Sequence, residues 1–197
     1  MGGKLPIRIL SYEQIREEAD RFLAIYNQKG VVPVPIEEIV EFSFKINIIP
    51  VPGLQRTLEV DGFISSDLKS ITVDQFVMEE RVPRYRFTLA HELGHAWLHK
   101  DILQDFNFDS VDTWKNFQIE MSEEDYGWLE FQAHAFAGLV LVPKEPLAIR
   151  KEALQNRIKA NGLDPTTEAA QLIMNRSLAV DFNVSPGVIE RRIPKDR

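Results

Sequence analysis

Cysteine is absent from the 197-residue chain, which therefore has neither a disulfide framework nor a thiol nucleophile. No apolar run approaches the roughly 18 residues that a membrane-spanning helix needs, so we expect no membrane span. The first six residues lack the apolar segment of a secretory signal. Together these absences favour a cytoplasmic protein.

Positive charge is also scarce, because 23 Lys and Arg stand against 30 Asp and Glu, which gives a net charge of -7. Such a chain repels DNA and RNA, so we expect no direct nucleic-acid partner. Residues 144–197 are mildly basic, and residues 178–193 faintly resemble a helix-turn-helix, but we interpret them as a small helical cap. Apolar residues make up 44% of the chain, as in a globular domain with a real core.

The stretch 88–99 contains H-E-x-x-H, the one motif in the chain that specifies a chemistry. Residues four apart in an α-helix lie about 40° from each other on one face, because each residue turns about 100°. His91 and His95 are therefore placed to bind one Zn²⁺. Glu92 lies beside them without being the natural third ligand, which suits a general base for water at the metal.

The side chains that flank this motif are strongly apolar: Phe87, Leu89, Ala90, Leu93, Trp97 and Leu98. A helix this buried should not carry His-Glu-His without partners for the polar groups. A metal ion supplies such a partner, and the alternative is a structural pair of histidines satisfied by hydrogen bonds. We expect the metal site.

A third zinc ligand must come from elsewhere, since catalytic zinc usually has three protein ligands and a water. His99 lies about 12 Å beyond His91 along a straight helix, too far for both to share one ion. We expect His99 at the helix C-terminus, where it interacts with the helix dipole. The pattern H-E-x-x-H-x-x-G-x-x-H is excluded, because Leu98 holds the Gly position and Asp101 the last His position.

A second apolar helix, expected over residues 122–142, offers the third ligand. Glu130 and His134 are four residues apart, so they share one face of it. Glu130 as the ligand gives a His₂Glu site, and His134 then supports a ligand or stabilises the oxyanion of the transition state. The reverse assignment, with His134 as the ligand, stays open.

The rest of the pattern predicts an α+β fold. We expect a small, twisted, mainly antiparallel sheet packed on the two ligand-bearing helices, followed by a helical C-terminal extension. Residues 101–125 are expected to form a long loop, either alone or with one short helix in it. Gly62 interrupts the second strand, either as a bulge or where a ligand approaches the backbone. Helices are predicted at about 11–27, 35–44, 79–100 and 122–142, and strands at about 46–51, 58–65 and 69–74.

Three blocks of this sequence resemble the ImmA/IrrE family of metallo-endopeptidases. Residues 84–95 match R-x-R-F-T-x-A-H-E-x-G-H closely, and residues 130–143 resemble E-x-[EQ]-A-N-x-F-A-x-x-L-L-x-P. Residues 33–39 and 62–64 resemble the N-terminal helix and sheet of the family, so that the likeness covers about residues 12–145. The departure is His134, which stands where the family usually has Asn.

The resemblance implies a zinc endopeptidase with one Zn²⁺ per chain, held by His91, His95 and Glu130, and with Glu92 as the base. Members commonly act in phage and mobile-element regulation or in stress responses, where they cleave or inactivate a repressor. The expected partner is therefore a protein substrate, with a repressor as the candidate. The alternative is a regulatory protein-binding module with a zinc site and little proteolytic activity.

The same reasoning divides the chain into two parts. We expect a metallopeptidase domain at residues 1–145 and a helical extension at residues 146–197 that packs on it. We do not expect the N-terminal helix-turn-helix domain that many members of the family carry.

Overall fold

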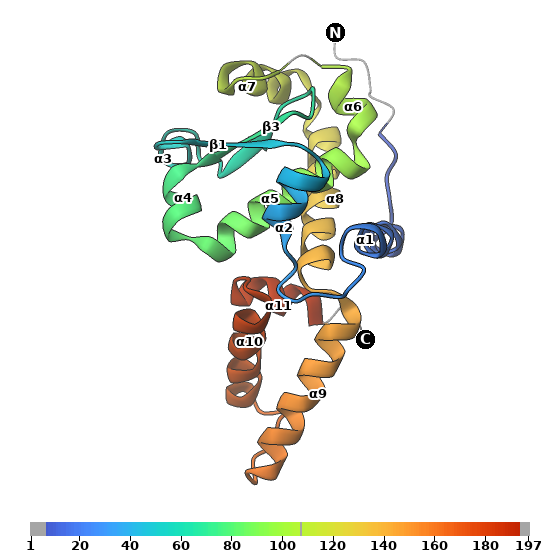
Figure 1. Cartoon of the computed structure of the whole chain (residues 1–197), viewed down its shortest axis with the longest axis vertical. Helices are drawn as coiled ribbons and strands as arrows, with labels where there is room; N and C mark the ends of the chain where they lie inside the picture. Colours follow the sequence, from blue (N-terminus) through green and yellow to red (C-terminus); the bar gives the residue numbers. More distant parts are fainter. Residues whose placement is uncertain (1–6, 107, 194–197) are drawn as a thin grey trace.

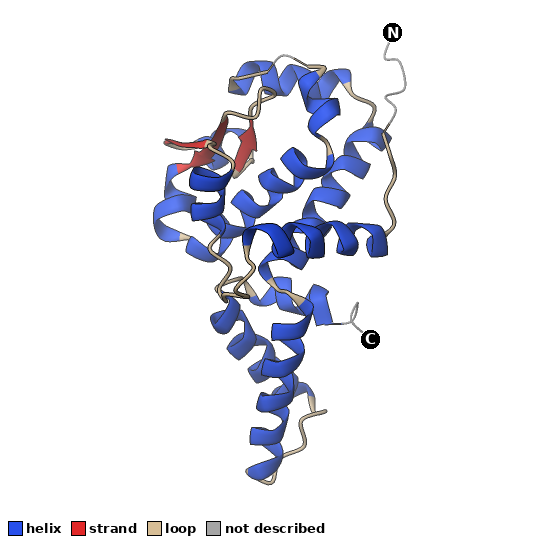
Figure 2. Ribbon diagram, turned by 45° about the vertical axis from the view of Figure 1, so that its right-hand side comes forward, coloured by secondary structure: helices blue, strands red, loops and turns tan. Residues whose placement is uncertain are grey.

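The computed structural model describes residues 7–106 and 108–193. The N-terminal stretch 1–6 lies outside the described residues, and so do both outer bounds of the predicted division, residues 1 and 197. Helices dominate the described chain, and a small sheet lies at one side of its larger part, as Figure 2 shows. Among the helices described, none is both long and apolar enough to cross a membrane.

Helix α1 (Tyr12–Tyr26) begins where the sequence predicts it. The Ser11 hydroxyl accepts from the Gln14 backbone N–H at 3.3 Å, and the Gln14 side chain accepts from the Ser11 N–H at 2.9 Å. The buried face of α1 packs on helix α8 (Glu123–Leu141). The second predicted helix is also present, as α2 (Ile36–Glu38) and a π-helical turn, η1 (Ile39–Ser43).

The sheet contains β1 (Asn47–Val51), β2 (Gly62–Ile64) and β3 (Ser70–Asp74) in the order β1-β3-β2. Strand β3 pairs antiparallel with β2 but parallel with β1. The α+β fold is confirmed, but the expectation of a mainly antiparallel sheet is wrong, because the sheet is mixed. The hairpin of β2 and β3 folds back so that β3, and not β2, lies beside β1.

The second predicted strand, 58–65, is shorter than expected, because Leu54–Leu58 form a short helix, α3. Gly62 pairs in regular register with Val73, so the glycine does not mark a bulge. A Cβ atom at Gly62 would lie 2.6 Å from the Thr72 carbonyl oxygen and 2.9 Å from Thr88 Cγ2. The glycine therefore lets β2 pack closely against both β3 and helix α5 (Val82–Leu98).

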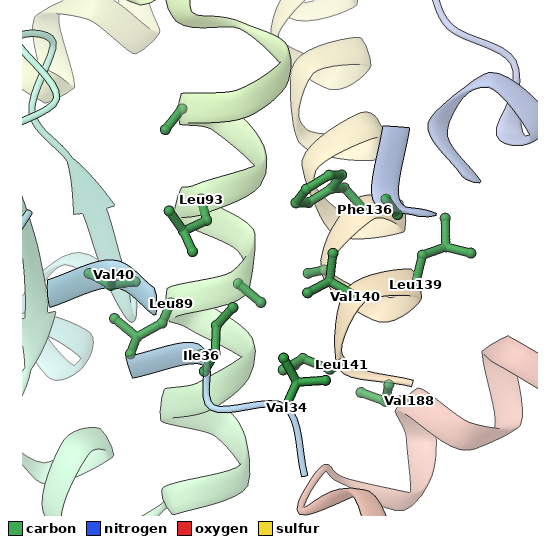
Figure 3. Close-up of a cluster of buried hydrophobic side chains, with 14 of the residues drawn as sticks. Val34, Ile36, Val40, Leu89, Leu93, Phe136, Leu139, Val140, Leu141 and Val188 are labelled. Carbon is green, nitrogen blue, oxygen red and sulfur yellow. The ribbon is translucent and has the colours of Figure 1, made fainter. Parts of the chain in front are cut away.

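Helices α5 and α8 cross at the centre of the part of the molecule that contains the sheet (Figure 1). The short helix α4 (Gln75–Glu80) precedes α5 in the chain. Figure 3 shows Phe136 and Val140 of α8 pointing toward α5, while Leu89 and Leu93 of α5 point to its other side, where Val40 lies. All five side chains belong to the same core. The two backbones approach closely at Gly94, where a Cβ atom would lie 3.1 Å from the backbone of Ala133. This close crossing sets the positions of the polar residues on both helices.

Residues 101–125 are more ordered than the expected loop. They contain α6 (Lys100–Gln104) and α7 (Val111–Glu120), whose first turn is capped by Ser110. The ring of Trp114 stacks on Phe63 of β2 at 5.5 Å, and Phe117 stacks on Phe108 at 4.6 Å. The expectation of a mostly irregular segment is wrong, because aromatic burial against the sheet holds these helices in place.

Helices α9 (Lys144–Ala160), α10 (Glu168–Phe182) and α11 (Pro186–Arg192) complete the described chain. The helical C-terminal extension is therefore present among the described residues, with breaks at residues 161–167 and 183–185. In Figure 1, α9 and α10 project away from the sheet, and α11 returns to the end of α8. There the Arg192 Nε donates to the Val142 carbonyl at 3.2 Å. The proposed division at residues 145 and 146 stays a prediction.

Candidate metal centre

Three side chains from the two crossing helices meet at one point. The Nε2 atoms of His91 and His95 on α5 lie 3.1 Å apart. Glu130 on α8 places one carboxylate oxygen 3.2 Å from the His91 Nε2 and the other 3.2 Å from the His95 Nε2. These three residues form a group that can hold a metal ion.

The spacing and chemistry of this group fit zinc. Tetrahedral zinc with bonds of about 2.0–2.1 Å has ligand atoms roughly 3.3 Å from one another. The three distances between the side chains here, 3.1 to 3.2 Å, are close to that value. Two imidazole nitrogens and a carboxylate oxygen are also the donor types that zinc takes in hydrolytic enzymes.

The charge of Glu130 also suits a cation. Burial opposes ionisation of this carboxyl, but hydrogen bonds from His91 and His95, together with their positive charge, outweigh it and hold the Glu130 pKa well below its usual value. For His91, burial is the largest single influence and acts to lower the pKa, but the hydrogen bond to Glu130 and the negative charges of Glu92 and Glu130 together outweigh it, so the pKa is raised. A bound metal would replace the histidine protons that face Glu130, and the ionised carboxylate could then bind the metal as an anionic ligand.

Glu92 lies next to the metal group, and a backbone N–H of strand β2 holds its carboxylate in place. Its side chain is only 5% exposed, and its Oε2 accepts the backbone N–H of Ile64 at 2.9 Å. Burial raises the Glu92 pKa, against the lowering effect of the charges on His91 and His95. A carboxyl group held beside the ligands with a raised pKa is suited to accept and donate a proton.

A cavity of about 460 Å³ contains this group, and it extends well beyond α5 and α8. Strand β2 forms one wall, and Trp114 and Phe117 of α7 form another. The C-terminal region contributes a third wall that sequence reasoning missed, because the faint helix-turn-helix pattern says nothing about where α11 packs. That wall consists of Ser185, Val188 and Arg191.

His134 lines the same cavity but lies outside the group of ligand atoms. Its ring centroid is 6.3 Å from that of His91 and 4.7 Å from that of Phe87. Of the two candidates on α8, the structure brings Glu130 to the paired histidines. The catalytic role of His134 stays a prediction.

His99 lies at the C-cap of α5, as its position in the sequence predicts. It is only 3% exposed, and its Nδ1 is 3.2 Å from the Nδ1 of His95. Burial lowers the His99 pKa to about 2, so the ring is neutral and does not meet the helix dipole as a cation. The contact with His95 was not part of the sequence-based expectation.

Comparison with known proteins agrees with this geometry. A peptidase family model described as IrrE N-terminal-like domain matches residues 77–194, well over half of the chain. The chain belongs to this family. The matched range contains the whole metal group and helices α9 to α11, and the predicted resemblance is confirmed.

The fold also has a counterpart among solved structures. A Mycobacterium tuberculosis transcriptional regulator superposes with a TM-score of 0.53 and 18% sequence identity, over 90% of the present chain. The match covers 54% of that regulator, so the present chain spans about half its length. At this identity the likeness shows the fold alone. The comparison with curated proteins gave no match.

Proposed function

We propose that the protein is a zinc-dependent endopeptidase that hydrolyses a peptide bond in a protein substrate. The observation that carries this proposal is the anchored carboxylate of Glu92 beside the three-ligand group, with its Oε2 held by the Ile64 N–H at 2.9 Å. A structural zinc site needs no such residue, whereas a hydrolase needs a base next to its metal. Membership of a peptidase family supports the same reading.

His91, His95 and Glu130 would hold the zinc ion, and bound zinc polarises a carbonyl and makes a water more acidic. Glu92 accepts the proton of the attacking water and passes it to the leaving amine. The Ile64 N–H keeps the Glu92 carboxylate in one orientation during both transfers. His134, at the cavity wall beside His91, is proposed to stabilise the oxyanion of the transition state.

Strand β2 offers a place for the substrate backbone. The Asp61 carbonyl and the Ser65 N–H both point toward β3, where they pair with Asp74 and Ser70. Since backbone direction alternates along a strand, the polar groups of Gly62 and Ile64 point away from β3. The Ile64 N–H is used by Glu92, and the remaining groups can pair with an extended peptide added to this sheet edge.

For the substrate itself we propose a repressor, in phage or mobile-element regulation or in a stress response. The support is the family resemblance of residues 84–95 and 130–143. The fold shared with a transcriptional regulator is compatible with such a pathway and identifies no partner.

The test is co-expression of the chain with repressor-like proteins encoded beside its gene, followed by detection of cleavage products. Glu92→Gln is the matched control, because it removes the base and leaves the ligands in place. We expect cleavage by the wild type and a loss of about 100-fold or more in the variant, with zinc content unchanged. Full activity in Glu92→Gln would remove Glu92 from the mechanism. A partner bound by both forms and cut by neither would support the protein-binding module instead.

A further inference from the structure

The imidazole of His99 contacts the metal group from behind. His95 directs its Nε2 toward His91 and Glu130, and its Nδ1 toward the Nδ1 of His99 at 3.2 Å. Both rings are buried, His95 with 8% and His99 with 3% of its surface exposed. No other hydrogen bond of the His95 Nδ1 is found among the described residues.

This contact requires one proton between two nitrogens, because one ring must donate and the other accept. A histidine that binds a metal through Nε2 uses the lone pair of that atom, so its proton is on Nδ1. His95 is then the donor and the His99 Nδ1 the acceptor. We propose that His99 is a positioning residue that accepts the Nδ1 proton of His95 and so holds the His95 Nε2 lone pair toward the metal.

The other end of the His99 ring shows that Nδ1 is the nitrogen that this histidine uses. With Nδ1 as the acceptor, the proton of His99 must be on Nε2, and that atom is buried without a hydrogen-bond partner. An orphaned buried N–H is unfavourable, and a leucine would fill the space without it. The useful property of a histidine here is therefore its Nδ1. Metal-bound histidines usually donate to a carboxylate, a carbonyl or water, and a neutral imidazole performs the same task without adding charge.

The inference rests on the metal site of the proposed function but not on proteolysis, and zinc affinity tests it. His99→Leu fills the space but cannot accept a hydrogen bond. His99→Asn places its Oδ1 as many bonds from the backbone as the His Nδ1, so it can accept the same proton. In chelator competition we expect zinc binding about 10–100-fold weaker in His99→Leu, with most of the loss recovered in His99→Asn.

Equal weakening in both variants would assign His99 to packing, and unchanged affinity in His99→Leu would remove it from the site; either result overturns the proposal. Long-range ¹H–¹⁵N spectra of the zinc-loaded wild type give a reading that does not depend on how the variants fold. We expect the proton on Nδ1 in His95 and on Nε2 in His99, and the opposite form of His99 would contradict the proposal. A wild type that binds no zinc would instead overturn the metal site itself.

Discussion

Helices α5 and α8 and helices α9 and α10 are both long pairs joined in one chain, yet they are packed very differently. The first pair meets so closely that a Cβ atom at Gly94 would lie 3.1 Å from the backbone of Ala133. The second pair leaves large apolar side chains in solvent, with Ile173 61% and Val180 78% exposed. Close packing brings His91, His95 and Glu130 together from two separate helices, and the group of potential metal ligands found in the described chain lies there.

The C-terminal helices take part in the site in another way. Helix α11 packs on α8, and together with its N-cap residue Ser185 it adds Val188 and Arg191 to the cavity wall. These residues supply shape and one positive charge, whereas the first pair supplies the metal ligands. The comparison therefore separates a closely packed helix pair that carries the potential metal ligands from C-terminal helices that add part of the cavity wall, and the following variants test this difference between the two regions.

The largest effect is expected on zinc affinity, from substitutions in helix α8. Glu130→Ala should abolish tight zinc binding, because it removes a ligand atom that lies 3.2 Å from each histidine. His134→Asn should keep most of the affinity, since His134 lies outside the ligand group. Loss of a residue that only supports a ligand lowers metal affinity by about 10–100-fold. The zinc affinities of the two variants should therefore differ clearly.

Zinc titration of both variants in one buffer measures this difference, and His134→Asn serves as the control for the helix itself. It also installs the residue that the family usually has. The assignment would be reversed if His134→Asn lost the metal while Glu130→Ala kept it.

A smaller effect is expected at the helix crossing. Gly94→Ala should lower the free energy of unfolding by about 1–3 kcal/mol, because its Cβ would lie 3.1 Å from the backbone of Ala133. Gly127→Ala on α8 is the matched control, since a Cβ atom there meets nothing within 4 Å. Gly127→Ala should stabilise by up to about 1 kcal/mol through helix propensity. Denaturant unfolding compares the two, and equal shifts would show that the crossing is not tightly packed.

The smallest effect is expected on the projecting pair. Ile173→Ala should change the free energy of unfolding by no more than about 0.5 kcal/mol, because the side chain is 61% exposed. The adjacent Met174 is fully buried, and Met174→Ala should cost about 2–5 kcal/mol in the same denaturant experiment. A large loss of stability in Ile173→Ala would mean that this face of α10 is covered in solution.

The sequence predicts the centre better than its surroundings, for physical reasons. The placing of His91, Glu92 and His95 depends on helix geometry alone, and the pairing of Glu130 with them needs only one further helix face. The contact of His95 with His99 follows from the same spacing of four residues, so it too was within reach of the sequence.

Features that depend on distant contacts were not predicted. The parallel pairing of β1 with β3 depends on where a hairpin docks, and the order of α7 depends on the stacking of Trp114 on Phe63. The place of Val188 in the cavity wall depends on how α11 returns to α8. Local periodicity carries no information on any of these.

The most direct test of the account is the zinc content of the purified protein beside that of the double variant His91→Ala/His95→Ala. The account predicts about one zinc ion per wild-type chain and almost none in the variant, because the paired Nε2 atoms supply two of the three ligands. Circular dichroism of both forms confirms that the variant is folded. Equal zinc in the two proteins would contradict the central claim that these histidines form the metal site.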